Sequence, residues 1–209
     1  MLDELFERFD GAFSENTLRA YRSDMTNLIE WCDTQQLNYK ELTGQNLADY
    51  AESMAENVAT ATIRRRLASI SSVFNLAQFE NNTKHPDLLL ALKRIHRRKG
   101  RAQKQAPPLT KEVKAKLIEV CPNDTRGLRD RVLLELGYET MRRRSELCSF
   151  KFSDRVESPD GRIGLRLNFS KTDQFGRGKI IKISNQLSRL INEWGEVVGN
   201  EGYILRGIT

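Results

Sequence analysis

The most informative part of this sequence reads Arg129-Asp130-Arg131-Val132-Leu133-Leu134-Glu135-Leu136-Gly137-Tyr138-Glu139-Thr140-Met141-Arg142-Arg143-Arg144-Ser145-Glu146-Leu147. Its valine and leucine residues recur at helical spacing, which predicts an α-helix that runs from about Leu128 to Met141. Three consecutive arginines follow at once, so positive charge is concentrated where this helix ends.

The hydrophobic pattern changes its period after this turn. Three runs now show alternation, and they are Phe150 with Phe152, Ile163 through Phe169, and Ile180 through Ile183. Glycines at 161, 176 and 178 separate these runs. The pattern predicts a three-stranded antiparallel meander, and a further helix is expected near residues 186–198.

The first half of the chain reads as five helices in roughly 95 residues. Apolar stripes at helical spacing define them, and the stripe of the second helix contains Leu18, Tyr21, Met25 and Leu28. Ser14 is a candidate N-cap for that second helix, and Thr60 or Thr62 for the fourth. Pro86 suits the first turn of the fifth helix. A compact all-α domain is expected.

A basic segment separates the two halves. Residues 93–104 hold seven lysines and arginines, and Ala106-Pro107-Pro108 follows them. Because like charges repel and two prolines break a helix, we predict an extended linker. The expected division is a helical domain at 1–96, the linker at 97–108, and a second domain at 109–209. The fold class is mainly α, with the small antiparallel sheet in the second domain.

The composition narrows the class of protein. The net charge is +6 and the sequence pI is about 9.3, which suggests an anionic partner. The scattered cysteines Cys32, Cys121 and Cys148 argue against a disulfide scaffold, and Cys32 and Cys148 are expected to be buried. No metal site is expected, since the chain has only two histidines. It has no signal-like N-terminus and no apolar run of about 18–20 residues, so we expect a cytoplasmic protein without membrane contact.

Arginine and lysine gather on the helical domain and on the linker. Arginine donates paired hydrogen bonds to phosphate oxygens and guanine edges, which favours nucleic-acid binding. The alternative is a solvated face whose charges pair with neighbouring carboxylates, and charge alone does not separate DNA from RNA. The candidate DNA-binding residues are Arg19, Arg22, Arg64, Arg65, Arg66, Arg97, Arg98, Lys99, Arg101 and Lys104.

The stretch from Arg129 to Leu147 resembles the signature "RD…LLLLLYxTGLRxSEL" of the tyrosine site-specific recombinase (phage integrase) family. In this family the arginine two residues before "SEL" reaches the scissile phosphate, which the resemblance places at Arg143. Met141 and Arg142 stand where the family has glycine and leucine. The resemblance also implies that Glu146 supports the active-site arginines; a local salt bridge of Glu146 with Arg142 or Arg143 is the alternative.

Other segments extend the resemblance from about residue 10 to residue 206. Residues 168–179 resemble the hairpin that carries the catalytic lysine, with Lys171 as the first candidate and Lys179 as the second. Ala12 through Thr17, followed by Trp31-Cys32, is similar to the start of a Cre-like core-binding domain, and Thr62 through Leu67 is similar to its major-groove helix. The implied architecture is a SAM-like core-binding domain and the N-terminal part of the α+β catalytic domain.

The resemblance implies an enzyme that cleaves and rejoins DNA through a phosphotyrosine intermediate. It needs no cofactor or metal, its partner is double-stranded DNA, and the family assembles as a tetramer on DNA. The second arginine box and the nucleophile have no counterpart in these 209 residues, and Tyr203 is rejected as the nucleophile. We therefore expect a fragment that binds DNA without cutting it. The alternatives are a non-catalytic DNA-binding regulator derived from a recombinase and a helical RNA-binding protein.

Overall fold

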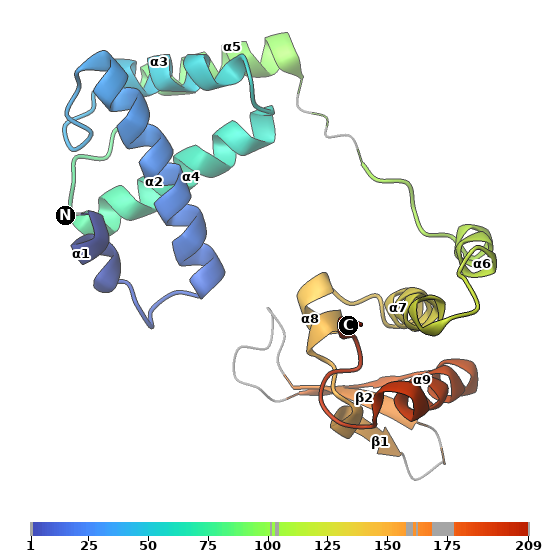
Figure 1. The fold of residues 1–209 in the computed structure, drawn as a ribbon. Coiled ribbons are helices and arrows are strands. Elements are labelled where there is room, and N and C mark those ends of the chain that lie inside the picture. Colours follow the sequence, from blue (N-terminus) through green and yellow to red (C-terminus); the bar gives the residue numbers. More distant parts are fainter. Residues whose placement is uncertain are drawn as a thin grey trace. The chain divides into compact units, whose positions relative to one another are not determined.

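The computed structural model describes residues 2–100, 102, 105–157, 161, 163–168 and 178–208. The chain forms two compact units, Met1–Gln105 and Ala106–Thr209, which are described separately (Figure 1). They divide within the 97–108 segment that the sequence marks as a linker.

The first unit is built from helices in its described residues. Their bounds are α1 Leu2–Glu7, α2 Glu15–Gln35, α3 Gly44–Ala55, α4 Thr60–Ala77 and α5 Pro86–Lys99. α3 lies alongside α5, and α2 packs across α4 (Figure 1). The core between them includes Leu28, Tyr50, Ile70, Phe74 and Leu88, each at most 1% exposed.

Local capping explains where these helices begin. Ser14 accepts a hydrogen bond from the Thr17 N–H, which confirms the predicted N-cap of α2, and Pro86 occupies the first turn of α5 as predicted. The prediction for α4 was wrong, because Ala59 occupies the N-cap position without a side-chain cap. Thr60 already belongs to the helix, and its hydroxyl donates to the Gly100 carbonyl at 3.1 Å.

The basic segment departs from its predicted extended form. α5 continues to Lys99, so residues 93–99 are helical. The charges that were expected to repel are matched by α3: Arg98 pairs with Glu52 at 2.6 Å, and Lys99 Nζ donates to the carbonyls of Ala55 and Val58. The Glu52 carboxylate and two backbone carbonyls thus stabilise the end of α5 as a helix, where the cluster of like charges predicted an extended linker.

The second unit combines helices with a small sheet. Its described elements are α6 Lys111–Glu119, α7 Thr125–Thr140, α8 Arg144–Ser149, a 3-10 turn at Phe152–Asp154, β1 Arg155–Glu157, β2 Ile163–Leu167, β3 Lys179–Lys182 and α9 Asn185–Val198. Among the described residues the sheet has the antiparallel order β1-β2-β3, with Leu165 between Arg155 and Ile181. The meander is confirmed.

The first strand of the meander was predicted at the wrong place. Phe150, the C-cap of α8, and Phe152, in the 3-10 turn, are both buried, and the N–H of Lys151 between them donates to Asp154 Oδ2 at 2.8 Å. The strand itself begins at Arg155, and Phe169, expected to extend the second run, lies outside the described residues. The alternating burial of Phe150 and Phe152 is thus produced by a turn and not by a β-strand.

Two contacts fix the helices of the second unit around its core. The buried Trp194 of α9 donates its indole N–H to the Ile204 carbonyl at 2.7 Å. Glu139 of α7 accepts from the N–H and hydroxyl of Ser184 at 2.8 and 2.5 Å, which ties α7 to the N-cap of α9. The helix that leads to the three arginines is therefore anchored.

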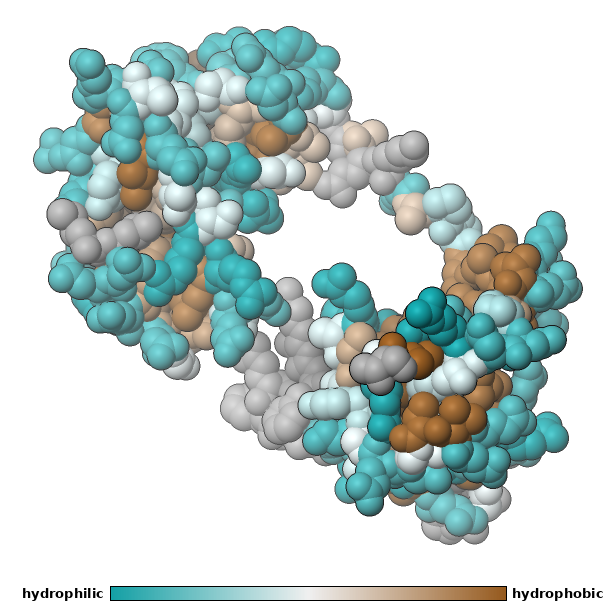
Figure 2. Space-filling view, viewed as in Figure 1, coloured by the Kyte–Doolittle hydropathy of each residue, from teal (hydrophilic) through white to brown (hydrophobic). Residues whose placement is uncertain are grey.

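α6 is attached differently from the other helices. None of its residues is fully buried, and Val113, Leu117 and the adjoining Val120 are exposed, giving hydrophobic residues on the visible surface there (Figure 2). Its contact with α7 includes Lys114, whose ammonium group lies 2.6 Å from Glu135 and 4.6 Å from the centre of the Tyr138 ring. The Lys114 and Glu135 side chains are 15% and 4% exposed.

The burial of two cysteines tests an expectation from the sequence. Cys32 is buried as predicted, but Cys148 is exposed, because α8 turns Leu147 toward the core instead. In the part of the chain that the structure describes, no helix combines the length and apolar character needed to cross a bilayer.

Candidate functional site

The turn after α7 directs the three arginines differently. Met141 ends the helix with φ 50°, a left-handed conformation that glycine adopts without strain and other residues adopt at a cost of about 1–2 kcal/mol. Arg142 then folds back, and its Nε donates to the Thr140 carbonyl at 2.8 Å. Arg144, the first residue of α8, is exposed.

Arg143 is held by Glu146 in two ways. It occupies the N-cap position of α8, and its backbone N–H donates to Glu146 Oε2 at 3.1 Å. Its guanidinium Nη1 donates to Glu146 Oε1 at 3.0 Å. The Arg143 side chain is 56% exposed while that of Glu146 is 6% exposed. The local salt bridge allowed by the sequence is therefore present, on the side of Arg143.

The electrostatics of Glu146 follow from these contacts. Burial by itself raises the pKa of the Glu146 carboxyl, since a low-dielectric site disfavours the charged form. Hydrogen bonds from the Arg143 N–H and guanidinium, with the charges of Arg143 and Arg142, outweigh burial and bring the pKa below its ordinary value. Glu146 is thus a carboxylate at neutral pH that fixes one side of Arg143.

This arrangement leaves donors of Arg143 available. Within the described residues, no acceptor other than Glu146 bonds the Arg143 guanidinium. The group keeps Nε and Nη2 donors on an exposed side chain, and such donors form charge-assisted bonds with phosphate oxygens. Chemically, the turn is able to hold a phosphate group next to a fixed, ionised carboxylate.

Of the two candidate catalytic lysines, Lys179 is among the described residues and Lys171 is not. Lys171 lies outside the described residues, as do Arg101 and Lys104. Lys179 is the first residue of β3, exposed and paired with Leu167. At the last described position before residues 169–177, Asn168 donates to Asp154 Oδ1 at 3.0 Å, so β2 ends on a fixed contact.

The arginines of α4 fall into three environments. Arg64 is exposed, and none of the described residues pairs with it. Arg65 is 52% exposed and donates to both carboxylate oxygens of Asp24, at 2.5 and 2.9 Å. Arg66 is 22% exposed, donates to Asn27 Oδ1 at 2.6 Å and lies 3.8 Å from Asp24. Arg66 is therefore mainly bound within its own unit.

The remaining candidate cations are mostly paired. Arg19 donates to Asn16 at 3.2 Å, while Arg22 pairs with Asp3 at 2.7 Å and lies over the Phe6 ring. Arg98 and Lys99 contact α3 as described above, and Arg97 is exposed at the end of α5. The alternative to nucleic-acid binding, a face whose arginines pair with carboxylates, thus describes Arg22 and Arg98. Among the described residues, Arg64 and Arg97 have no such partner and remain available for a ligand.

Sequence reasoning missed Asp24. It lies in the apolar stripe of α2 beside Met25, and only 1% of it is exposed. An acidic residue on the buried face of an amphipathic helix signals a buried cationic partner, because an unpaired buried charge is costly. That signal could have predicted a cationic partner for Asp24 from the sequence, without saying which arginine or lysine it is.

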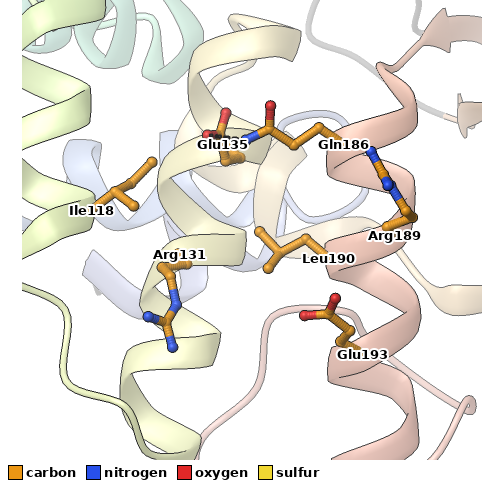
Figure 3. A pocket seen from close by; sticks show the side chains of 7 residues that line it. All are labelled: Ile118, Arg131, Glu135, Gln186, Arg189, Leu190 and Glu193. Carbon is orange, nitrogen blue, oxygen red and sulfur yellow. Dashed lines mark hydrogen bonds between the residues drawn. The ribbon is translucent and has the colours of Figure 1, made fainter.

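A cavity of about 250 Å³ lies between α6, α7 and α9 (Figure 3). Gln186 Nε2 donates to Glu135 Oε1 across it at 3.4 Å, and Leu190 projects from α9 toward α7 (Figure 3). It is lined by Ile118, Arg131, Glu135, Gln186, Arg189, Leu190 and Glu193. None of these is a candidate site residue, so the cavity is separate from the arginine turn. Among the described residues, no group of three metal-binding side chains occurs.

Comparisons with known proteins show what this chain is similar to. Residues 5–81 match the phage integrase N-terminal SAM-like domain. The chain is 29% identical over 180 residues to an integrase/recombinase XerD homolog of Selenomonas ruminantium, covering 84% of this chain and 52% of that protein. Against the tyrosine recombinase XerD of Rickettsia conorii it is 26% identical over 180 residues, covering 84% and 56%. The chain is thus similar to tyrosine recombinases over most of its length, and residues 5–81 match a phage integrase N-terminal SAM-like domain.

The match to tyrosine recombinases is partial in length, since the chain spans about half of these curated relatives. Two solved structures of the Tn1549 transposon integrase have the same fold. The complex with circular intermediate DNA gives a TM-score of 0.61 at 16% identity, covering 95% of this chain and 64% of that one. The complex with transposon right end DNA gives 0.63 at 16% identity, covering 91% and 63%.

Proposed function

We propose that these residues form the DNA-holding part of a tyrosine recombinase, which binds double-stranded DNA and supplies Arg143 to strand cleavage and rejoining. One observation carries the proposal. Arg143 is more than half exposed, yet the buried Glu146 carboxylate holds both its backbone and its guanidinium. The donors that Glu146 leaves open on Arg143 are therefore both oriented and accessible to a phosphate.

The two bonds between Glu146 and Arg143 suit the binding of a phosphate ligand. A long side chain loses rotamer freedom on binding, and a fixed guanidinium has already lost part of it. Glu146 also balances one positive charge while the site is empty. Fixed donors that point toward developing negative charge stabilise a phosphoryl transition state.

The chemistry proposed for the complete enzyme is a transesterification. A tyrosine hydroxyl oxygen attacks the scissile phosphorus, the bond from phosphorus to the 5′ oxygen breaks, and a lysine gives its proton to that leaving oxygen. Arg143 stabilises the phosphate oxygens, and Lys171, with Lys179 as the alternative, is the proton donor. Glu146 acts through Arg143.

A polypeptide of these 209 residues is proposed to hold DNA without forming the phosphotyrosine bond. No segment of it resembles the family's second arginine box or its nucleophile segment. Tyr203, which precedes the end of the sequence, pairs with Lys151 as an isolated bridge and lies 5.3 Å from its ammonium group. These contacts support a structural role for Tyr203.

Double-stranded DNA is the proposed partner because several independent features favour it. The SAM-like domain match covers α4, which carries the exposed Arg64, and Arg97 adds an exposed cation at the end of α5. The Tn1549 integrase structures of the same fold are complexes with DNA. We also expect copies of the chain to associate on DNA.

Two binding measurements test the proposal. Fluorescence anisotropy should show tighter binding to a pool of random DNA duplexes than to RNA duplexes, with an affinity that falls steeply as salt rises. A nicked suicide duplex, followed by a denaturing gel, should show no covalent protein–DNA product. Preference for RNA, or the absence of binding to DNA, would overturn the DNA assignment, and a trapped adduct would overturn the non-cleaving assignment.

A further inference from the structure

The buried carboxylate of Asp24 occupies an unusual place for an acid. It projects from the apolar face of α2 and is 1% exposed, and its two oxygens accept from Nη1 and Nη2 of Arg65 on α4. Arg66 adds a second positive charge 3.8 Å away. A buried pair of this kind gives little net stability over an apolar pair, so stability alone does not account for it.

The pairing geometry leaves one edge of the Arg65 guanidinium open. Asp24 takes the end of the fork, one hydrogen from each terminal nitrogen. The side edge, made of the Nε hydrogen and the outer Nη2 hydrogen, bonds no acceptor among the described residues. The Arg65 side chain is 52% exposed, so a ligand at the surface can approach it, and the pairing with Asp24 fixes the orientation of these two parallel donors.

The helix surface around Arg65 permits close approach of a ligand. Residues 61, 65, 68 and 72 lie on one face of α4, and apart from Arg65 they are Ala61, Ala68 and Ser72. Small side chains on both sides of one arginine let a helix enter a groove. Arg64, which neighbours this face, has no such carboxylate partner among the described residues.

We propose that Arg65, held in place by Asp24, reads a guanine in the major groove of the DNA site. Two parallel donors match the N7 and O6 acceptors on the guanine edge, whereas adenine presents one acceptor and one donor there. Asp24 is the positioning residue and Arg65 the reading residue, while Arg64 contributes charge without base preference. This inference rests on the proposed DNA binding by α4.

The experiment selects binding sites from randomised DNA duplexes with the wild-type chain and with Arg65→Lys, Asp24→Asn and Arg64→Lys. Wild type is expected to select guanine at one position by on the order of tenfold over the other bases. Arg65→Lys keeps the charge but loses the fork, so the preference at that position should fall to within about twofold while the salt dependence stays unchanged. Arg64→Lys, the matched control, should keep the guanine preference.

A base analogue keeps the test decisive if Asp24→Asn fails to fold, which circular dichroism reports. With 7-deazaguanine at the selected position, wild type should lose roughly the same factor as Arg65→Lys does on guanine, and Arg65→Lys should be insensitive to the analogue. An unchanged guanine preference in Arg65→Lys would overturn the inference, as would wild-type binding without base preference. In both cases DNA binding itself stands, whereas failure of the wild type to bind DNA overturns the proposed function.

Discussion

The pair of Lys114 and Glu135 gives a prediction whose size follows from its burial. The two side chains are 15% and 4% exposed and 2.6 Å apart, and Lys114→Ala leaves Glu135 with Gln186 at 3.4 Å as its remaining contact among the described residues. Breaking a buried pair by removing one partner costs about 3–5 kcal/mol, and the lost contact with Tyr138 adds to this. We expect Lys114→Ala to lower the free energy of unfolding of the second unit by about 3–5 kcal/mol.

Tryptophan fluorescence during urea unfolding measures this change. The sequence has two tryptophans, so a Trp31→Phe background leaves Trp194, in the core of the second unit, as the reporter. Lys116→Ala is the matched control on the same helix, because Lys116 is exposed and its loss should cost under about 0.5 kcal/mol. The double variant Lys114→Met with Glu135→Met should recover most of the loss, since an apolar pair replaces the ionic one. A loss below about 1 kcal/mol for Lys114→Ala would refute the reasoning that this pair anchors α6.

Three further perturbations have expected outcomes. The folded-state pKa of Glu146 lies below its ordinary value of 4.5, so its stabilising contribution is present above pH 4.5 and is lost as the pH falls through the folded pKa. The difference in unfolding free energy between wild type and Glu146→Gln, measured in urea, should therefore shrink in acid. A difference that grows in acid would contradict this. Met141→Gly should leave stability unchanged or raise it by about 1 kcal/mol in thermal unfolding, since it relieves a left-handed conformation of an exposed residue, and a clear loss would count against strain at this turn. Arg64→Ala should weaken DNA binding and lower the slope of log affinity against log salt by about 1, while Arg66→Ala should mainly lower stability; an unchanged slope for Arg64→Ala would remove Arg64 from the interface.

The sequence predicted the features that depend on local spacing. Ser14 and Pro86 mark helix starts that the structure confirms, because these signals involve residues within one turn of each other. The meander of three strands followed for the same reason, from alternation between glycine-marked turns.

Features that depend on contacts between distant segments were not predicted. The first strand was misplaced because Phe150 and Phe152 are buried by the core of the unit while their backbone turns. The partners of the cations were equally non-local: Arg98 pairs with Glu52 of α3, Lys99 donates to the carbonyl of Ala55 at the end of α3, and Arg65 pairs with Asp24 of α2. The resemblance to tyrosine recombinases pointed to Arg143 as a candidate, but its two bonds to Glu146 required coordinates.

The claim that Arg143 binds a DNA phosphate is tested most directly by changing single phosphates. A duplex selected for tight binding is prepared as a series in which one phosphate at a time is a neutral methylphosphonate, and affinity is measured for wild type and for Arg143→Ala. We predict one phosphate whose neutralisation weakens the wild type by about 1–3 kcal/mol and leaves Arg143→Ala unaffected, the signature of a direct charge-assisted contact. Equal losses for both proteins at every phosphate in the series would contradict the account.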